Sequence, residues 1–168
     1  MRPDAPRGLY LARDGTWFHD GQGIHHERLA ALLHRSIARG DDGALIVTTG
    51  RDVMGFEAQD APFLVREVRI ADALLTLSDG SQEILQGPLH IDDQGRVRVR
   101  VKDGRFWALL SRAVAHLVMA GVEENVEENV EEDDDDDSAR VRVGNVTVAL
   151  RASAAAPVSA APGQGWSG

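Results

Sequence analysis

Short apolar runs alternate with turn residues through the first part of the chain. Apolar positions on either side of Arg13-Asp14-Gly15 predict a β-hairpin, because glycine accepts the positive φ that tight turns need. Leu29, Leu32, Leu33 and Ile37 recur at helical spacing and predict an inward-facing helix surface. The predicted elements are strands 8–12 and 16–19, a helix near 26–38, and a hairpin of strands 44–49 and 53–57.

The same pattern recurs 80 residues later, so that Leu9 aligns with Leu89 and Leu29 with Leu109. The second set of predicted elements is strands 89–92 and 96–101, a helix near 105–119 with Leu117 inward, and strands 139–143 and 146–151. Two more strands, 63–70 and 73–77, are expected to extend the second sheet. The sequence therefore predicts an α+β protein of two repeated β-β-α-β-β units packed together.

Changes in composition divide the chain into predicted segments. Residues before Pro62 are pushed toward extended geometry, which favours a boundary there. The tail has little to bury and no period, which is typical of disorder. The segments are an N-terminal arm (1–7), a first unit (8–62), a second unit (63–151) that contains an acidic insert (121–138), and a disordered Ala/Pro/Ser/Gly tail (152–168).

Charge is concentrated in that insert. The formal net charge is −9, but eleven acids and no base lie between Glu123 and Asp137, and the rest has 18 basic and 16 acidic residues. The chain has no Cys, which excludes disulfides, thiolate nucleophiles and iron–sulfur clusters. No apolar run reaches the roughly 20 residues that a membrane span needs, so we expect a cytoplasmic protein without a membrane partner.

Basic residues alternate with valines in the second unit. The candidate anion stripe consists of Arg96, Arg98, Arg100 and Lys102, extended by Arg140 and Arg142 if the last hairpin pairs with this strand. Arginines on one strand face attract phosphate groups. The same pattern fits a solvated outer face that guards against edge pairing, and we favour this interpretation. The rest of the chain is not basic enough for us to expect a nucleic-acid partner.

Two motifs carry a resemblance to a known family. Asp14-Gly15-Thr16-Trp17-Phe18-His19-Asp20-Gly21 and the later Asp60-Ala61-Pro62-Phe63 occur in an order that resembles the bacterial domain of unknown function 1285 (DUF1285) family, over roughly residues 7–120. The resemblance implies a duplicated motif whose C-terminal part looks somewhat like a pleckstrin-homology barrel. It also implies a site for a nucleotide-like ligand at the interface of the two units, and a role in signalling.

Six residues are candidates for that ligand site. Trp17 and Phe63 would supply stacking surfaces, and His19 and Arg35 would meet a phosphate or carboxylate. Asp60 would accept hydrogen bonds from a base or sugar, and Arg112 is a further contributor. The structural alternatives are that Trp17 is a core residue of its hairpin and that Asp60 stabilises its own turn.

The most consistent interpretation is a non-catalytic ligand-binding or sensing module. The chain has no G-x-S-x-G element and no phosphate-binding G-x-x-x-x-G-K-[ST] loop, and we expect no enzyme activity and no cofactor. His19, His25, His26 and His34 do not have the spacing of a metal-ligand set, so no metal is expected. The alternative is a protein-interaction adaptor without a small ligand, whose protein partner the sequence does not identify.

Overall fold

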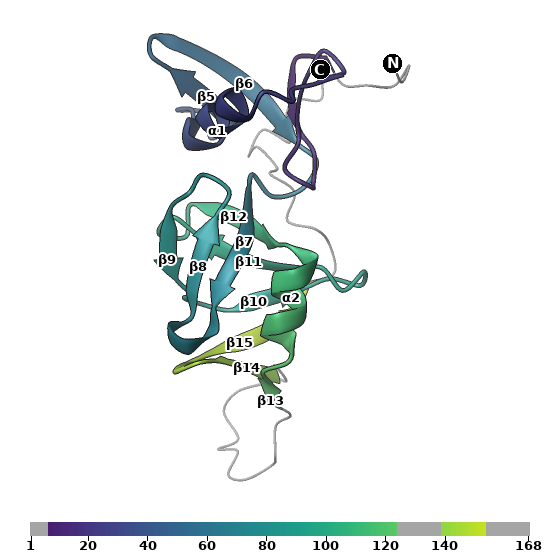
Figure 1. Cartoon of the computed structure of the whole chain (residues 1–168), viewed down its shortest axis with the longest axis vertical. Helices are drawn as coiled ribbons and strands as arrows, with labels where there is room; N and C mark the ends of the chain where they lie inside the picture. Colours follow the sequence, from purple (N-terminus) through teal and green to yellow (C-terminus); the bar gives the residue numbers. More distant parts are fainter. Residues whose placement is uncertain (1–6, 124–138, 154–168) are drawn as a thin grey trace.

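The computed structural model describes residues 7–123 and 139–153, which form two sheets arranged one beyond the other along the molecule (Figure 1). The predicted arm up to Pro6, most of the acidic insert and the tail beyond Ser153 lie outside the described residues. The linker 59–62 leads from one sheet to the other. The architecture is α+β, with two short helices.

The first sheet has six strands in the order β3-β2-β1-β6-β5-β4. Helix α1 (Glu27–Arg35) lies beside β5, and His26 caps its N-terminus by accepting a hydrogen bond from the Leu29 amide. The strands are β1 (Leu9–Leu11), β2 (Trp17–His19), β3 (Gln22–Gly23), β4 (Ile37–Arg39), β5 (Leu45–Thr49) and β6 (Asp52–Ala58).

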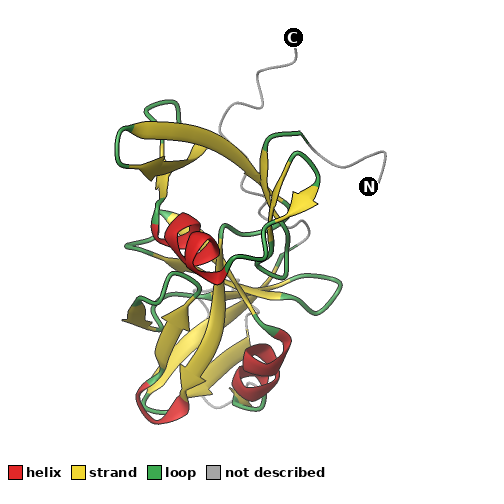
Figure 2. Ribbon diagram, turned by 45° about the horizontal axis from the view of Figure 1, so that its top comes forward, coloured by secondary structure: helices red, strands yellow, loops and turns green. Residues whose placement is uncertain are grey.

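The second sheet has nine strands in the order β13-β14-β15-β10-β11-β12-β7-β8-β9 and curls into a half-barrel (Figure 2). Helix α2 (Arg112–Met119) packs against β7, β12 and β14. A 3₁₀ helix (Ile70–Asp72) joins β7 to β8. The strands are β7 (Phe63–Arg69), β8 (Leu74–Leu77), β9 (Gln82–Ile84), β10 (Leu89–Ile91), β11 (Val97–Val101), β12 (Phe106–Leu110), β13 (Val122–Glu123), β14 (Ala139–Val143) and β15 (Val146–Ala152).

The two units pair their strands in the same way. In the first unit β1 is antiparallel to β2 and parallel to the last strand, β6. In the second unit β10 is antiparallel to β11 and parallel to the last strand, β15. Two strands in each unit were not predicted, one before the helix (β3 and β12) and one after it (β4 and β13). The observed order is therefore β-β-β-α-β-β-β in β1–β6 and again in β10–β15.

The prediction of one helix over 105–119 was wrong. Residues Phe106–Leu110 form strand β12 in the middle of the second sheet, between β11 and β7. Four of these five side chains are buried, and a run that is apolar on both faces fits a central strand as well as a helix. The helix begins only after Ser111, whose side chain accepts a hydrogen bond from the Val114 amide.

The inward faces of both helices also differ from the prediction. In α2 the buried residues are Val114 and Val118, whereas Leu117 is 52 % exposed. In α1 Leu33 is buried, but Leu29 and Leu32 are exposed. The shorter helices therefore cover less of each sheet than helices of the predicted length would cover. No helix within the described part of the chain has the length and apolar character needed to cross a membrane.

A buried ion pair ties the linker to the second sheet. Asp60 accepts two hydrogen bonds from Arg98 of β11, from Nε at 2.7 Å and from Nη2 at 2.6 Å. Arg98 and Asp60 are 0 % and 1 % exposed. Arg98 also donates from Nη1 to Asp92 at 2.9 Å, and Arg13 of the first unit donates to Asp60 at 3.2 Å. One carboxylate therefore connects both units.

This arrangement predicts that Arg98→Met destabilises the fold strongly. Removing one partner of a buried ion pair leaves an uncompensated charge, which typically costs about 3–5 kcal/mol. The measurement is chemical denaturation of the full chain. Arg69→Ala is the matched control, because Arg69 pairs with Asp72 on the exposed surface and its loss should leave the denaturation midpoint nearly unchanged. Equal effects of the two substitutions would contradict the role given to Arg98.

Candidate functional site

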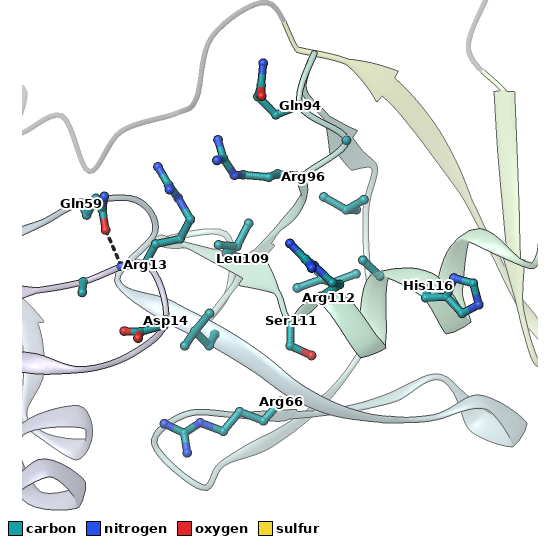
Figure 3. A pocket seen from close by; sticks show the side chains of 16 residues that line it. Arg13, Asp14, Gln59, Arg66, Gln94, Arg96, Leu109, Ser111, Arg112 and His116 are labelled. Carbon is teal, nitrogen blue, oxygen red and sulfur yellow. Dashed lines mark hydrogen bonds between the residues drawn. The ribbon is translucent and has the colours of Figure 1, made fainter. Parts of the chain in front are cut away.

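A hollow of about 1020 Å³ lies at the boundary between the two units (Figure 3). We call it the arginine cleft. Its size is at the upper end of the roughly 300–1,000 Å³ that is usual for small-molecule sites. It is lined by Ala12, Arg13, Asp14, Gln59, Leu64, Arg66, Gln94, Gly95, Arg96, Val97, Leu109, Leu110, Ser111, Arg112, Ala115 and His116.

Four arginines from different elements line this cleft. Arg13 lies in the turn between β1 and β2, and Arg66 lies on β7. Arg96 directly precedes β11, and Arg112 is the first residue of α2. In Figure 3 the guanidinium groups of Arg13 and Arg96 extend toward the same part of the cleft. The tertiary fold therefore gathers positive charge that is scattered over 100 residues of sequence.

Most of this positive charge is not neutralised within the described structure. The side chains of Arg66, Arg96 and Arg112 form no hydrogen bond or ion pair with any described residue. Asp14 is the one acidic residue among those that line the cleft, and its Oδ1 already accepts a hydrogen bond from the Thr16 amide at 2.9 Å. The lining therefore has an excess of guanidinium donors suited to an anion.

The N-terminus of α2 adds to this positive character. Ser111 and Arg112 both line the cleft, and the first turn of α2 contains no acidic residue. Backbone amides at the start of a helix carry a partial positive charge that favours anions. Gln59 and Gln94 add amide groups that can donate or accept, although the Gln59 Oε1 atom already accepts from the Arg13 amide at 2.9 Å (Figure 3).

Asp60 lies directly behind Arg13 and stays ionised. Burial of its carboxyl group opposes ionisation, but the hydrogen bonds and charge of Arg98, together with Arg13 and the Ala61 amide, outweigh this and lower the pKa of Asp60. The carboxylate is 1 % exposed and is surrounded by its protein donors. It holds Arg13 at the edge of the cleft.

Comparison with known proteins finds similarity to solved structures. No protein-family model matches the chain, and no curated protein matches it either. A solved DUF1285 family protein from Silicibacter pomeroyi DSS-3 is similar in structure, with a TM-score of 0.65 and 19 % identity. The match covers 88 % of this chain and 81 % of that one. The chain has the fold of this DUF1285 family protein.

A second solved structure, a DUF1285 family protein from Shewanella baltica OS155, has a TM-score of 0.48 and 19 % identity. That match covers 62 % of this chain and 84 % of the other. The Asp14–Gly21 and Asp60–Phe63 motifs carry a resemblance to the same family as the Silicibacter pomeroyi protein, whose fold this chain shares. At this level of identity the likeness concerns the fold and leaves the chemistry of the site to the residues themselves.

Within the DUF1285 fold, Trp17 is a core residue. Its side chain is 0 % exposed and packs edge-on against His34 and Phe56, with ring centroids 5.4 Å and 5.0 Å away. A fully buried ring has no face left for a ligand, so the stacking role expected for Trp17 is corrected to a packing role. His19 is exposed beside Asp20 and lines neither the arginine cleft nor the smaller hollow that Arg35 and Phe63 line.

The other candidate residues are divided between different places. Arg112 lines the arginine cleft, whereas Arg35 and Phe63 line a second, smaller hollow. Asp60 is buried between the two units, where it accepts from its neighbour Ala61 as well as from the two arginines. The structure therefore does not bring the six predicted residues together into one site.

The candidate anion stripe is interrupted. Alternation does place Arg98 and Arg100 on the face of β11 opposite to its valines, but Arg98 is fully buried and paired with Asp60 and Asp92. Arg100 is exposed and stacks over Trp107 at 4.4 Å, and Lys102 bonds to Asp79 at 2.7 Å. Arg140 and Arg142 lie on β14, which is separated from β11 by β15 and β10. These six residues do not form a continuous exposed stripe.

Sequence reasoning missed Arg13, Arg66 and Ser111 as members of the cleft. Arg13 precedes the Asp-Gly turn, and Ser111 stands where a helix cap is expected once β12 is recognised as a strand. Nothing in the local sequence distinguishes Arg66 from Arg69, the other exposed arginine of β7. Its place in the cleft follows only from the packing of the two units.

His34 lies behind the cleft and is buried without a hydrogen-bond partner for its Nδ1 atom. Burial of the imidazole is the main cause that lowers the pKa of His34 from 6.5 to about 4, and the positive charge of Arg66 lowers it further. The neutral ring packs against Trp17. The folded state therefore favours the neutral form of His34.

The His34 pKa predicts a loss of stability in mild acid. Because the folded-state pKa lies below the unfolded value, the unfolded chain binds the proton more tightly and stability falls as the pH drops from 6.5 toward 4. The free energy of unfolding is therefore expected to be about 2 kcal/mol lower at pH 5 than at neutral pH. Denaturation curves at pH 7.5 and pH 5 of the wild type and of His34→Leu measure it. In His34→Leu, most of the difference in stability between pH 7.5 and pH 5 should disappear. His90 accounts for the part that remains, because burial also lowers its pKa.

The exposed His25 provides the control, because its side chain keeps its hydration on folding. His25→Ala should retain the wild-type dependence on pH. An unchanged pH dependence in His34→Leu would refute the assignment.

Proposed function

We propose that the protein is a non-catalytic ligand-binding or sensing module that takes a small anionic, nucleotide-like ligand in the arginine cleft. The observation that carries the proposal is a hollow of about 1020 Å³ lined by four arginines, of which three have side chains that form no hydrogen bond or ion pair with a described residue. Guanidinium groups bind phosphates and carboxylates through paired hydrogen bonds. A signalling role is part of the same proposal and rests on the family resemblance.

The apolar part of the lining supports a ligand with a ring as well as charges. Leu64, Leu109 and Ala115 line the cleft beside the arginines. Small-molecule sites combine such apolar walls with a few well-placed polar groups. A nucleotide-like ligand has an anionic end for the guanidinium groups and a flat base for the aliphatic wall, which accounts for both kinds of lining.

We also infer that the two units derive from one duplicated motif. The support is the shared element order of β1–β6 and β10–β15 and the shared pairing, in which β1 is parallel to β6 and β10 is parallel to β15. The pleckstrin-homology-like character of the C-terminal unit is likewise a proposal, supported by the curled second sheet and the helix α2 packed against it. Under this proposal the cleft lies at the interface between two copies of one motif.

An adaptor function is the alternative. It is favoured by apolar side chains on the surface of the first unit, where Leu29, Leu32, Val53 and Met54 are between 41 % and 65 % exposed. Exposed apolar patches often mark protein–protein contacts. An adaptor would show no thermal stabilisation by small anions, which separates the two functions.

The proposal predicts that inorganic pyrophosphate and adenosine 5′-monophosphate bind the full chain, measured by isothermal titration calorimetry. Arg96→Ala/Arg112→Ala should weaken binding at least tenfold, since hydrogen bonds to charged groups contribute about 1.5–3 kcal/mol each. Arg140→Ala/Arg142→Ala is the matched control, because it removes the same charge from β14, outside the cleft. Equal affinity of the two double variants, or no binding to the wild type, would contradict the proposed site.

A further inference from the structure

A second hollow of about 310 Å³ lies at another part of the boundary between the units, and we call it the phenylalanine pocket. Its lining is Arg35, Ile37, Ala38, Arg39, Phe63, Asp79, Lys102, Arg105 and Phe106. It shares no lining residue with the arginine cleft. Its volume is at the lower end of the range for small-molecule sites.

Two aromatic rings form the apolar part of this pocket. Phe63 and Phe106 pack edge to face, with centroids 5.3 Å apart and planes at 73°. Ile37 and Ala38 of β4 contribute aliphatic surface from the first unit. Edge-to-face pairs are a favourable arrangement that fixes the orientation of both rings. The pocket therefore has a preformed apolar wall.

Two cations above these rings are already held by the protein. The Arg39 guanidinium lies 4.9 Å from the Phe106 centroid and donates to the Arg105 carbonyl at 3.0 Å and 3.1 Å and to the Gly43 carbonyl at 2.9 Å. The Lys102 Nζ lies 5.4 Å from the Phe63 centroid and donates to Asp79 at 2.7 Å and Ser81 at 2.6 Å. These contacts make the walls rigid.

Two further cations have guanidinium N–H groups that donate to no described residue. Arg35 forms no side-chain hydrogen bond or ion pair with any described residue, and Arg105 uses only its Nε atom, to bond to the Lys102 carbonyl at 3.1 Å. Asp79 is the one acidic residue in the lining, and it is already paired with Lys102. The pocket therefore has an excess of positive charge beside an apolar wall.

We propose that the phenylalanine pocket is a second binding site, specific for a small aromatic monocarboxylate. The planar carboxylate matches a guanidinium group, and the volume of the pocket suits one ring better than a nucleotide. The ring contacts Ile37 and Ala38 of β4 and the small part of Phe63 and Phe106 that stays accessible (2 % and 6 %), while Arg35 and Arg105 bind the charge. This site does not depend on the anion site in the arginine cleft.

Titration of the ¹⁵N-labelled full chain with sodium benzoate, followed by NMR, tests the proposal. We expect saturable shifts of the amides of Ala38 and of Lys102 to Phe106. Benzamide, which has the same shape without the charge, and acetate, which lacks the ring, should each bind at least tenfold more weakly. Equal binding of benzamide, shifts centred on the cleft residues Gln94 to Arg96, or no saturable shift with benzoate would overturn the proposal.

Two variants locate the site independently. Arg35→Gln/Arg105→Gln removes the free charge and should weaken benzoate binding at least tenfold, whereas Arg96→Ala/Arg112→Ala in the arginine cleft should leave it unchanged. Ala38→Leu fills the pocket without altering charge and should also abolish binding. A dispersed NMR spectrum confirms that each variant is folded. Undiminished binding to folded Arg35→Gln/Arg105→Gln or to folded Ala38→Leu would overturn the proposal, whatever pyrophosphate does in the cleft.

Discussion

The buried carboxylate of Asp60 is the contact on which the arrangement of the two units depends. It belongs to the linker between the sheets, yet it accepts hydrogen bonds from Arg98 of the second sheet and from Arg13 of the first hairpin. A carboxylate in this position needs all of these donors, because an unpaired buried charge is strongly unfavourable. The sheets are therefore held in the one relative orientation in which the donors meet Asp60.

That orientation also positions both hollows. Gln59, immediately before Asp60, lines the arginine cleft, and Phe63, three residues after it, lines the phenylalanine pocket. Arg13 connects the two roles, since it lines the cleft and also binds the carboxylate. Gly15 is pressed against Leu64 of β7 so closely that a Cβ there would lie 2.7 Å from the Leu64 Cδ1 atom, and its φ is +92°. The Asp-Gly turn is thus part of the same junction.

Sequence patterns predicted the elements better than the surroundings of individual side chains. Alternation correctly assigned the valines of β11 to the core face, but Arg98 on the other face is buried and paired with Asp60, which lies 38 residues earlier in the chain. The apolar run Phe106–Leu110 was predicted to be helical because periodicity does not separate a central strand from a buried helix. The motif made Trp17 a candidate for ligand binding, but its ring is buried in the hydrophobic core. The arginine cleft was beyond local patterns, since its four arginines come from four separate elements.

The net charge of −9 does not argue against anion binding in this molecule. Eleven acidic residues lie between Glu123 and Asp137, and the remaining sequence is close to neutral. Among the residues that line the cleft, four are arginines and Asp14 is the one acid. These charges are the nearest ones that a ligand in the cleft meets. The affinity of that ligand depends on how the guanidinium groups are positioned. The Asp60 carboxylate positions one of them, because it accepts a hydrogen bond from Arg13.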